Sequence, residues 1–111
     1  METPKQHLER QLTDKMAEEQ EKYREWLLSL PPEEILKQTY SYTVRQDILL
    51  AWQDCPLTVS QIKALLRSPT PLVDIEMEFN KRETDYMETL ADCITERAKI
   101  MESKKREDFS R

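Results

Sequence analysis

The sequence contains no glycine among its 111 residues, whereas average usage of roughly 7% would give about eight. Glycine is the residue that adopts positive φ angles without a steric penalty, so tight β-hairpin turns of types I′ and II′ are disfavoured here. Phosphate-binding loops also depend on glycine, because the backbone must approach the phosphate closely. The absence of glycine therefore argues against an all-β fold and against nucleotide-dependent activity of the Rossmann or P-loop type.

Cysteine and histidine, residue types that serve as nucleophiles and metal ligands, are also scarce. The two cysteines, Cys55 and Cys93, show no metal-binding or redox spacing, and the one histidine, His7, lies near the start of the chain. The longest apolar run covers residues 48–52, far short of the roughly 20 residues that span a bilayer. We therefore expect a cytoplasmic protein with reduced thiols that is not an enzyme, has no cofactor and no metal, and does not enter a membrane.

The charge is high and unevenly distributed. Charged residues make up 35% of the chain and apolar residues 38%, with a formal net charge of −5; this composition suits helices that have one apolar stripe and a broad polar face. Residues 68–102 carry nine acids and four bases, and the basic residues gather only in the tail 103–111. Phosphate contacts need a basic surface, so direct nucleic-acid binding is not expected.

Proline and cap residues divide the chain into four predicted helices. Thr3 and Gln6 form a capping box with Pro4 at the first helical position, and the first helix should stop before Pro31. The second should begin at Pro32, the third should cover about residues 58–67 and the fourth about 71–102. We predict an all-α fold, a compact bundle of about four helices with long first and last helices and two shorter central ones. Residues 1–102 would be one domain, and 103–111 a charged, frayed tail.

Apolar spacing predicts how these helices pack. The last helix repeats apolar residues every seven positions, and one residue of this stripe is Cys93, which should then be buried. The first helix has a similar stripe, so we expect the two long helices to pair along their length. The second helix is apolar on two faces and should be the central one, although Thr43 and Gln46 could cap a break within it.

Two apolar residues fall outside these stripes and are the best candidates for a binding patch, Leu28 and Tyr42. The other aromatic residues lie mostly within stripes and should pack in the core: Trp26, Tyr40, Trp52 and Tyr86. Three charged residues at the edge of the last stripe should have charged partners and not form a catalytic pair: Glu76, Glu83 and Arg97.

A row of acids is expected on the polar face of the last helix: Asp74, Glu78, Asp85, Glu88, Asp92 and Glu96. The simplest interpretation is a solvated face. The alternative is a phosphate-like ladder that binds a basic groove of a nucleic-acid enzyme, although Lys81 and Lys99 interrupt it.

Residues 47–66 also have the rhythm of the first two helices of a helix-turn-helix unit. The recognition helix would then begin near Pro71 and carry three acids, Asp74, Glu76 and Glu78. Acids at these positions would face phosphates and base acceptors, so this topology does not predict DNA reading.

Four segments are similar to a short, uncharacterised family of gut anaerobic bacteria, a domain of unknown function often carried on mobile elements. They are WLLSLPPEEIL at 26–36, YTVRQDIL at 42–49, ALLRSPTPL at 64–72 and KRETDYM at 81–87. The resemblance covers about residues 12–100 and brings no catalytic residues with it. It implies a bacterial cytoplasm and a role in conflict or transfer between genetic elements.

The leading hypothesis is a non-catalytic protein-interaction module, an adaptor or regulator that binds a protein partner through a helical surface. The first alternative is a small acidic inhibitor of a nucleic-acid-handling nuclease, of the anti-restriction or anti-CRISPR type. The second is a degenerate helix-turn-helix regulator. The last helix is longer than one small core needs, which is compatible with a homodimer.

Overall fold

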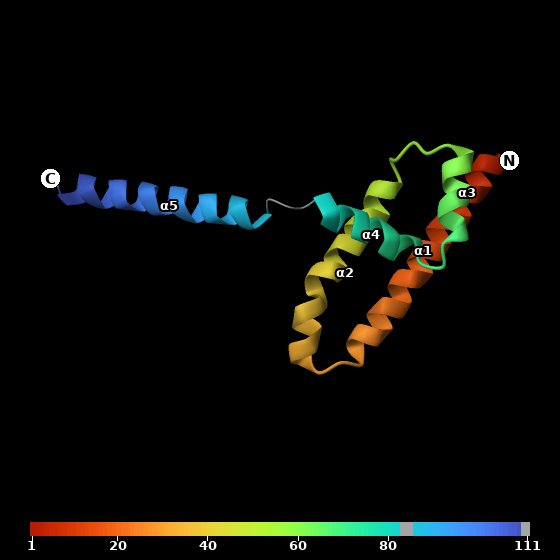
Figure 1. Cartoon of the computed structure of the whole chain (residues 1–111), viewed down its shortest axis with the longest axis horizontal. Helices are drawn as coiled ribbons and strands as arrows, with labels where there is room; N and C mark the ends of the chain where they lie inside the picture. The colour runs from red at the N-terminus through yellow and green to blue at the C-terminus, as the bar shows by residue number, and fades with distance from the viewer. Residues whose placement is uncertain (83–85, 110–111) are drawn as a thin grey trace. The chain divides into compact units, whose positions relative to one another are not determined.

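The computed structural model describes the backbone of residues 1–82 and 86–109, and the side chains of residues 1–82 and 86–104. Its elements are α1 (Pro4–Leu28), α2 (Pro32–Trp52), α3 (Val59–Arg67), α4 (Pro71–Arg82) and α5 (Tyr86–Phe109) (Figure 1). Across the described ranges every regular element is a helix, so the all-α prediction is confirmed. No helix in this part of the chain has both the length and the apolar character needed to cross a membrane.

The predicted caps form as expected. The hydroxyl of Thr3 accepts from the backbone N–H of Gln6, and the Gln6 side chain accepts in return from the Thr3 N–H. Thr58 and Gln61 make the same reciprocal pair at the start of α3, with distances of 3.2 and 2.8 Å. Between them α2 is continuous, so no helix break occurs at Thr43. Local capping therefore sets the starts of α1 and α3.

The expected single helix over 71–102 is wrong: α4 ends at Arg82 and α5 begins at Tyr86, which gives five helices where four were predicted. The intervening residues 83–85 lie outside the described part. The chain also separates into two compact units, residues 1–79 and 80–111. The single domain over 1–102 stays a prediction. Helix α5 continues to Phe109, beyond the predicted tail boundary. A seven-residue apolar spacing shows which positions share a face if a helix is continuous, but it does not test that continuity.

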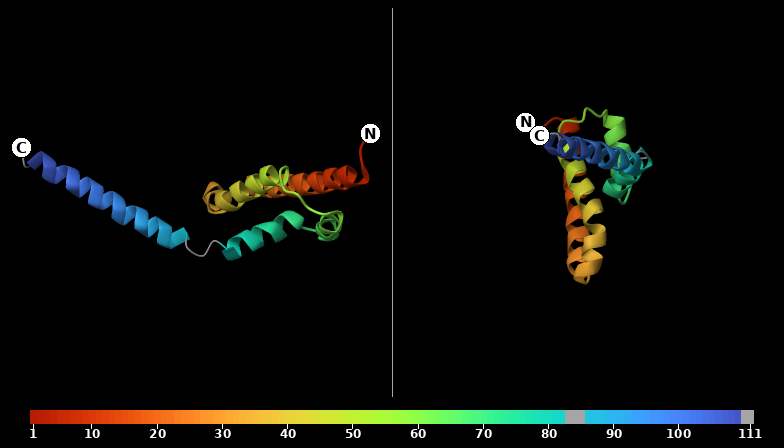
Figure 2. Two further views of the ribbon diagram at one scale, coloured as in Figure 1. Left: turned by 90° about the horizontal axis from the view of Figure 1, so that it is seen from above. Right: turned by 90° about the vertical axis from the view of Figure 1, so that its left-hand side faces the viewer.

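The core of the first unit centres on α1. Helices α1 and α2 form an antiparallel hairpin, and α3 lies beside the N-terminal part of α1 (Figures 1 and 2). The fully buried apolar residues of this core are Leu12, Met16, Ile62 and Leu72, from α1, α3 and α4. Burial of such a side chain stabilises the fold by about 1.5–3 kcal/mol.

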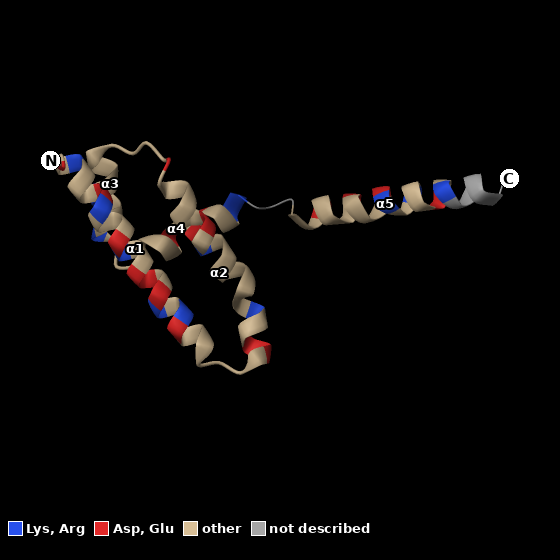
Figure 3. Ribbon diagram, turned by 180° about the vertical axis from the view of Figure 1, so that it is seen from behind, with Lys and Arg blue, Asp and Glu red and all other residues tan. Residues whose placement is uncertain are grey.

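Helix α2 is not the central helix that we expected, because α1 packs against both α2 and α3. One apolar face of α2 stays in solvent, with Leu36 71%, Tyr40 48% and Leu50 64% exposed. Figure 3 shows that charged residues are spread along α1, whereas much of α2 is uncharged.

The expected burial of the last-helix stripe is found at its start, where Leu72 is fully buried, but not in α5. Every α5 side chain from Tyr86 to Lys104 is exposed, including Cys93, which we had placed in a core. A small apolar residue in a heptad stripe is buried only when another element covers that stripe.

Candidate interaction surface

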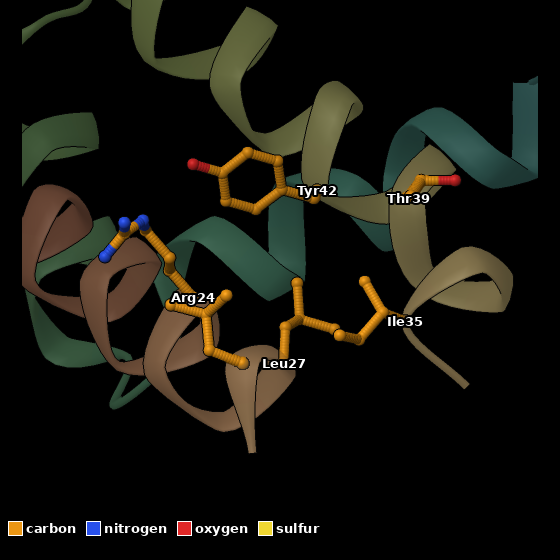
Figure 4. A pocket seen from close by; sticks show the side chains of 6 residues that line it. Arg24, Leu27, Ile35, Thr39 and Tyr42 are labelled. Atoms are coloured by element: carbon orange, nitrogen blue, oxygen red, sulfur yellow. The ribbon is translucent and has the colours of Figure 1, made fainter. Parts of the chain in front are cut away.

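A groove of about 220 Å³ lies between the C-terminal part of α1 and the N-terminal part of α2. Its lining comes from both helices (Figure 4): Arg24, Leu27, Leu28, Ile35, Thr39 and Tyr42. Leu27 is buried, Tyr42 is half-buried, and Leu28 is 63% exposed. The structure therefore brings the two predicted patch residues, Leu28 and Tyr42, to one surface.

Stacked side chains support the Tyr42 wall of this groove. The rings of Tyr23 and Tyr42 stack with their centroids 6.5 Å apart. The Arg45 guanidinium covers the Tyr23 ring at 3.7 Å from its centroid, within the range of a cation–π contact. The Tyr23 hydroxyl also donates to Gln38 Oε1 at 3.0 Å. These contacts join α1 to α2 and hold Tyr42 at the groove.

A buried glutamine, Gln20, lies about one helical turn before Tyr23 in α1 and connects α1 to α2. The Nε2 atom of Gln20 donates to the Tyr42 carbonyl at 3.2 Å and to Gln46 Oε1 at 3.1 Å. Gln20 is only 5% exposed, and its Oε1 is buried without a hydrogen-bond partner. The two hydrogen bonds of the Gln20 amide therefore fix the alignment of α1 with α2.

An ion pair ties α4 to this framework. Arg45 Nε lies 2.6 Å from Glu76 Oε1, and the other Glu76 oxygen accepts from the Ser41 hydroxyl. This confirms the prediction that Glu76 is a partnered residue, although it is buried and not at the rim. Of the other two residues in that prediction, Glu83 lies outside the described residues and Arg97 is exposed on α5.

Two charged residues of α1 hold the turn between α3 and α4. Lys15 Nζ donates to the Leu66 carbonyl at 2.7 Å, at the end of α3. The two carboxylate oxygens of Glu19 accept from the backbone N–H groups of Leu72 and Val73, at 2.9 and 3.0 Å. Charges of these signs suit helix ends, because a cation is favourable at a C-terminus and an anion at an N-terminus. Neither residue was predicted as a site residue, because their i, i+4 spacing is the only signal of them in the sequence.

The aromatic residues divide between core and surface. Trp52 is partly buried, packs on the core and donates from Nε1 to Thr13 Oγ1 at 2.8 Å, as the core prediction requires. Trp26, Tyr40 and Tyr86 are 50%, 48% and 48% exposed, so their predicted core positions are wrong. Trp26 still contacts the Tyr23 ring, with centroids 5.9 Å apart.

The acids of the predicted row are divided between two helices. Asp74, in the first turn of α4, accepts from the hydroxyls of Ser68 and Thr70 in the preceding turn. Glu78 is exposed on α4, and Asp85 lies outside the described residues. Three acids remain at i, i+4 spacing on α5, all exposed: Glu88, Asp92 and Glu96.

The residues considered for chemistry lie apart from the groove. His7 is exposed near Glu2 and Arg10, with its Nδ1 3.3 Å from Arg10 Nη2. Cys55 is exposed and lines a separate apolar cavity of about 310 Å³ next to the core, together with Trp52. Among the described residues no cluster of three or more histidine, cysteine or acidic side chains could hold a metal ion.

Comparison with known protein families identifies a family for this chain. The family model described as "Protein of unknown function (DUF3848)" matches residues 8–101. The chain belongs to this family. The match confirms the predicted resemblance to a domain of unknown function and reaches from α1 into α5, whereas the bacterial host and the mobile-element context stay predictions. No curated protein matches the chain, and no solved structure does either.

Proposed function

We propose that this DUF3848 chain is a protein-interaction module, an adaptor or regulator that binds a protein partner in the α1–α2 groove. The observation that supports this most is the coincidence of a groove with an exposed leucine, Leu28, on its edge. Exposed apolar groups beside a recess are typical of sites where a partner inserts a side chain.

The groove has the size and chemistry for one or two inserted apolar side chains. Leu27 and Ile35 supply its aliphatic lining, while Arg24 and Tyr42 supply residue types that dominate the energetics of protein interfaces. Three exposed apolar residues, Trp26, Leu36 and Tyr40, are each adjacent in sequence to a residue that lines the groove. Burial of the exposed part of Leu28 would favour binding by about 1–2 kcal/mol at ~25 cal/mol per Å².

The test compares two leucines with almost equal exposure. The Leu28→Glu variant introduces a charge at the groove, and Leu50→Glu introduces the same charge on α2 outside it; the two residues are 63% and 64% exposed. We expect affinity capture from a bacterial lysate to recover a partner with the wild-type chain and with Leu50→Glu. Capture with Leu28→Glu should fall at least about tenfold, the effect of ~1.4 kcal/mol. Equal capture by both variants would reject the groove as the binding site.

The two other functions stay predictions with less support. The nuclease-inhibitor hypothesis used six acids on one helix face, and the described acids are divided between α4 and α5. The helix-turn-helix hypothesis needs α4 as a reading helix, but Glu76 of that helix is buried against Arg45. A DNA titration at low salt tests the latter, and a salt-sensitive shift in mobility would support it.

A further inference from the structure

Within residues 80–111, helix α5 carries an apolar seam that no other described helix of that unit covers. The α5 seam consists of Met87, Leu90, Ile94 and Met101, together with Arg97 and Lys104, which continue the same spacing. Met87, Ile94 and Met101 are 72%, 71% and 63% exposed, and Leu90 is 40% exposed. In solution an isolated helix is only marginally stable, and most helical stability in proteins comes from packing of an apolar face. The seam therefore needs a partner surface.

The spacing of the seam indicates a helix as the partner. Residues 87, 94 and 101 form one row with a seven-residue period, and residues 90, 97 and 104 form a second row. Such paired rows fit between the side chains of another helix with the same period. A flat or irregular partner would not require this repeat.

We propose that the partner is α5 of a second copy of this chain, in antiparallel orientation. Residues 86–96 carry three acids and no base, whereas residues 97–109 carry five bases and three acids. Antiparallel pairing places the acidic half of each helix beside the basic half of the other, and parallel pairing places like charges together. The opposed helix dipoles favour the same orientation. In the antiparallel pair, the acidic half of each α5 helix therefore lies beside the basic half of the other.

One register uses every position of the seam. When Leu90 lies opposite Met101 of the second copy, Ile94 lies opposite Arg97 and Met87 lies opposite Lys104, because the two rows have the same period. The aliphatic stems of Arg97 and Lys104 then cover apolar side chains while their charged ends reach solvent. The dimer therefore has Leu90 and Met101 as its apolar layers, with Ile94 under the arginine stems.

The first test measures the mass of the full chain in solution by light scattering and sedimentation. We expect a dimer for the wild type, a monomer for Ile94→Lys, and a dimer for the matched control Thr95→Lys. Thr95 is exposed and follows Ile94 directly, but it lies on the opposite side of α5 from the seam. Circular dichroism accompanies each sample to measure helix content. A monomeric wild type, or an Ile94→Lys variant that stays dimeric, overturns the proposal.

The second test determines the orientation by disulfide formation, since two cysteines cross-link only when their Cβ atoms come within about 4.5 Å. In a chain with Cys55→Ser and Cys93→Ser, one sample carries Leu90→Cys and another Met101→Cys. We expect a covalent dimer on oxidation of the mixture and little from either sample alone. Cross-linking within each separate sample indicates parallel pairing and overturns the antiparallel proposal, as does the absence of cross-linking in all three. The α1–α2 groove lies outside α5, so failure here leaves the proposed function untouched.

Discussion

Arg45 Nε lies 2.6 Å from Glu76 Oε1, and this ion pair connects α2 to α4 with both side chains largely withdrawn from solvent, 12% and 6% exposed. The same guanidinium covers Tyr23, which stacks on Tyr42 at the groove. A single arginine therefore links the packing of α4 to the shape of the candidate binding surface. A substitution that breaks the Arg45–Glu76 ion pair should therefore also disturb the position of Tyr42 at the groove.

Replacement of Glu76 by leucine should destabilise the chain by about 3–5 kcal/mol, because it leaves the buried Arg45 charge without its partner. Urea denaturation monitored by circular dichroism measures the change in the free energy of unfolding. The double variant Arg45→Met/Glu76→Leu should recover most of the loss, since neither charge then remains. A double variant as unstable as the single one would show that packing, and not charge, dominates this site.

Replacement of Glu19 by alanine should cost about 1–2 kcal/mol, similar to the loss of a helix N-cap, because the N–H groups of Leu72 and Val73 lose their acceptor. The control is Glu18→Ala. Glu18 forms only an exposed ion pair with Lys22, worth about 0.3–0.5 kcal/mol. Urea midpoints of the two variants should therefore differ clearly. If they coincide, the interhelical cap contributes little to stability.

Truncation of Ile62 to alanine should destabilise the first unit by about 2–5 kcal/mol, because Ile62 is fully buried in the core. Leu50→Ala should change stability by less than about 0.5 kcal/mol, since Leu50 is 64% exposed. Thermal and urea unfolding measure both variants. A large effect at Leu50 would mean that the α2 face is covered in solution.

The capping box at Thr58 offers a smaller and more local effect. Thr58→Ala should cost about 1 kcal/mol, because α3 has only nine residues and its Gln61 N–H loses a side-chain acceptor. Thr58→Ser retains an acceptor at the same position and should behave like the wild type. Hydrogen exchange of the α3 amides resolves the effect locally. Equal exchange in the alanine and serine variants would contradict the role of the cap.

Local signals in the sequence predicted much of the fold. The capping boxes at Thr3 and Thr58 satisfy backbone N–H groups locally, and Pro32 has no N–H that needs an acceptor and has a φ angle fixed near the helical value. These features predict helix starts correctly because they need no tertiary contact. The placement of the helices was less predictable. Neither the exposure of α5 nor the central position of α1 follows from apolar periodicity, since periodicity shows that a face needs cover but not what covers it.

The candidate site was predictable only in part. Leu28 and Tyr42 could be predicted because they lie outside the apolar stripes of their helices, and both line the groove. The supporting contacts of Tyr23, Arg45 and Gln20 could not be predicted, since they depend on the alignment of α1 with α2. Glu19 was missed for the same reason, because its partners lie 53 and 54 residues away in the sequence.

The most direct test of the proposed interaction surface is site-specific photo-cross-linking in cells. A photoreactive amino acid replaces Leu28 in one sample and Leu50 in the other, since the two positions have almost equal exposure. We predict a covalent product with another protein at position 28 and none at position 50. Equal products at both positions, or no product at position 28, would contradict the claim that the α1–α2 groove binds a partner.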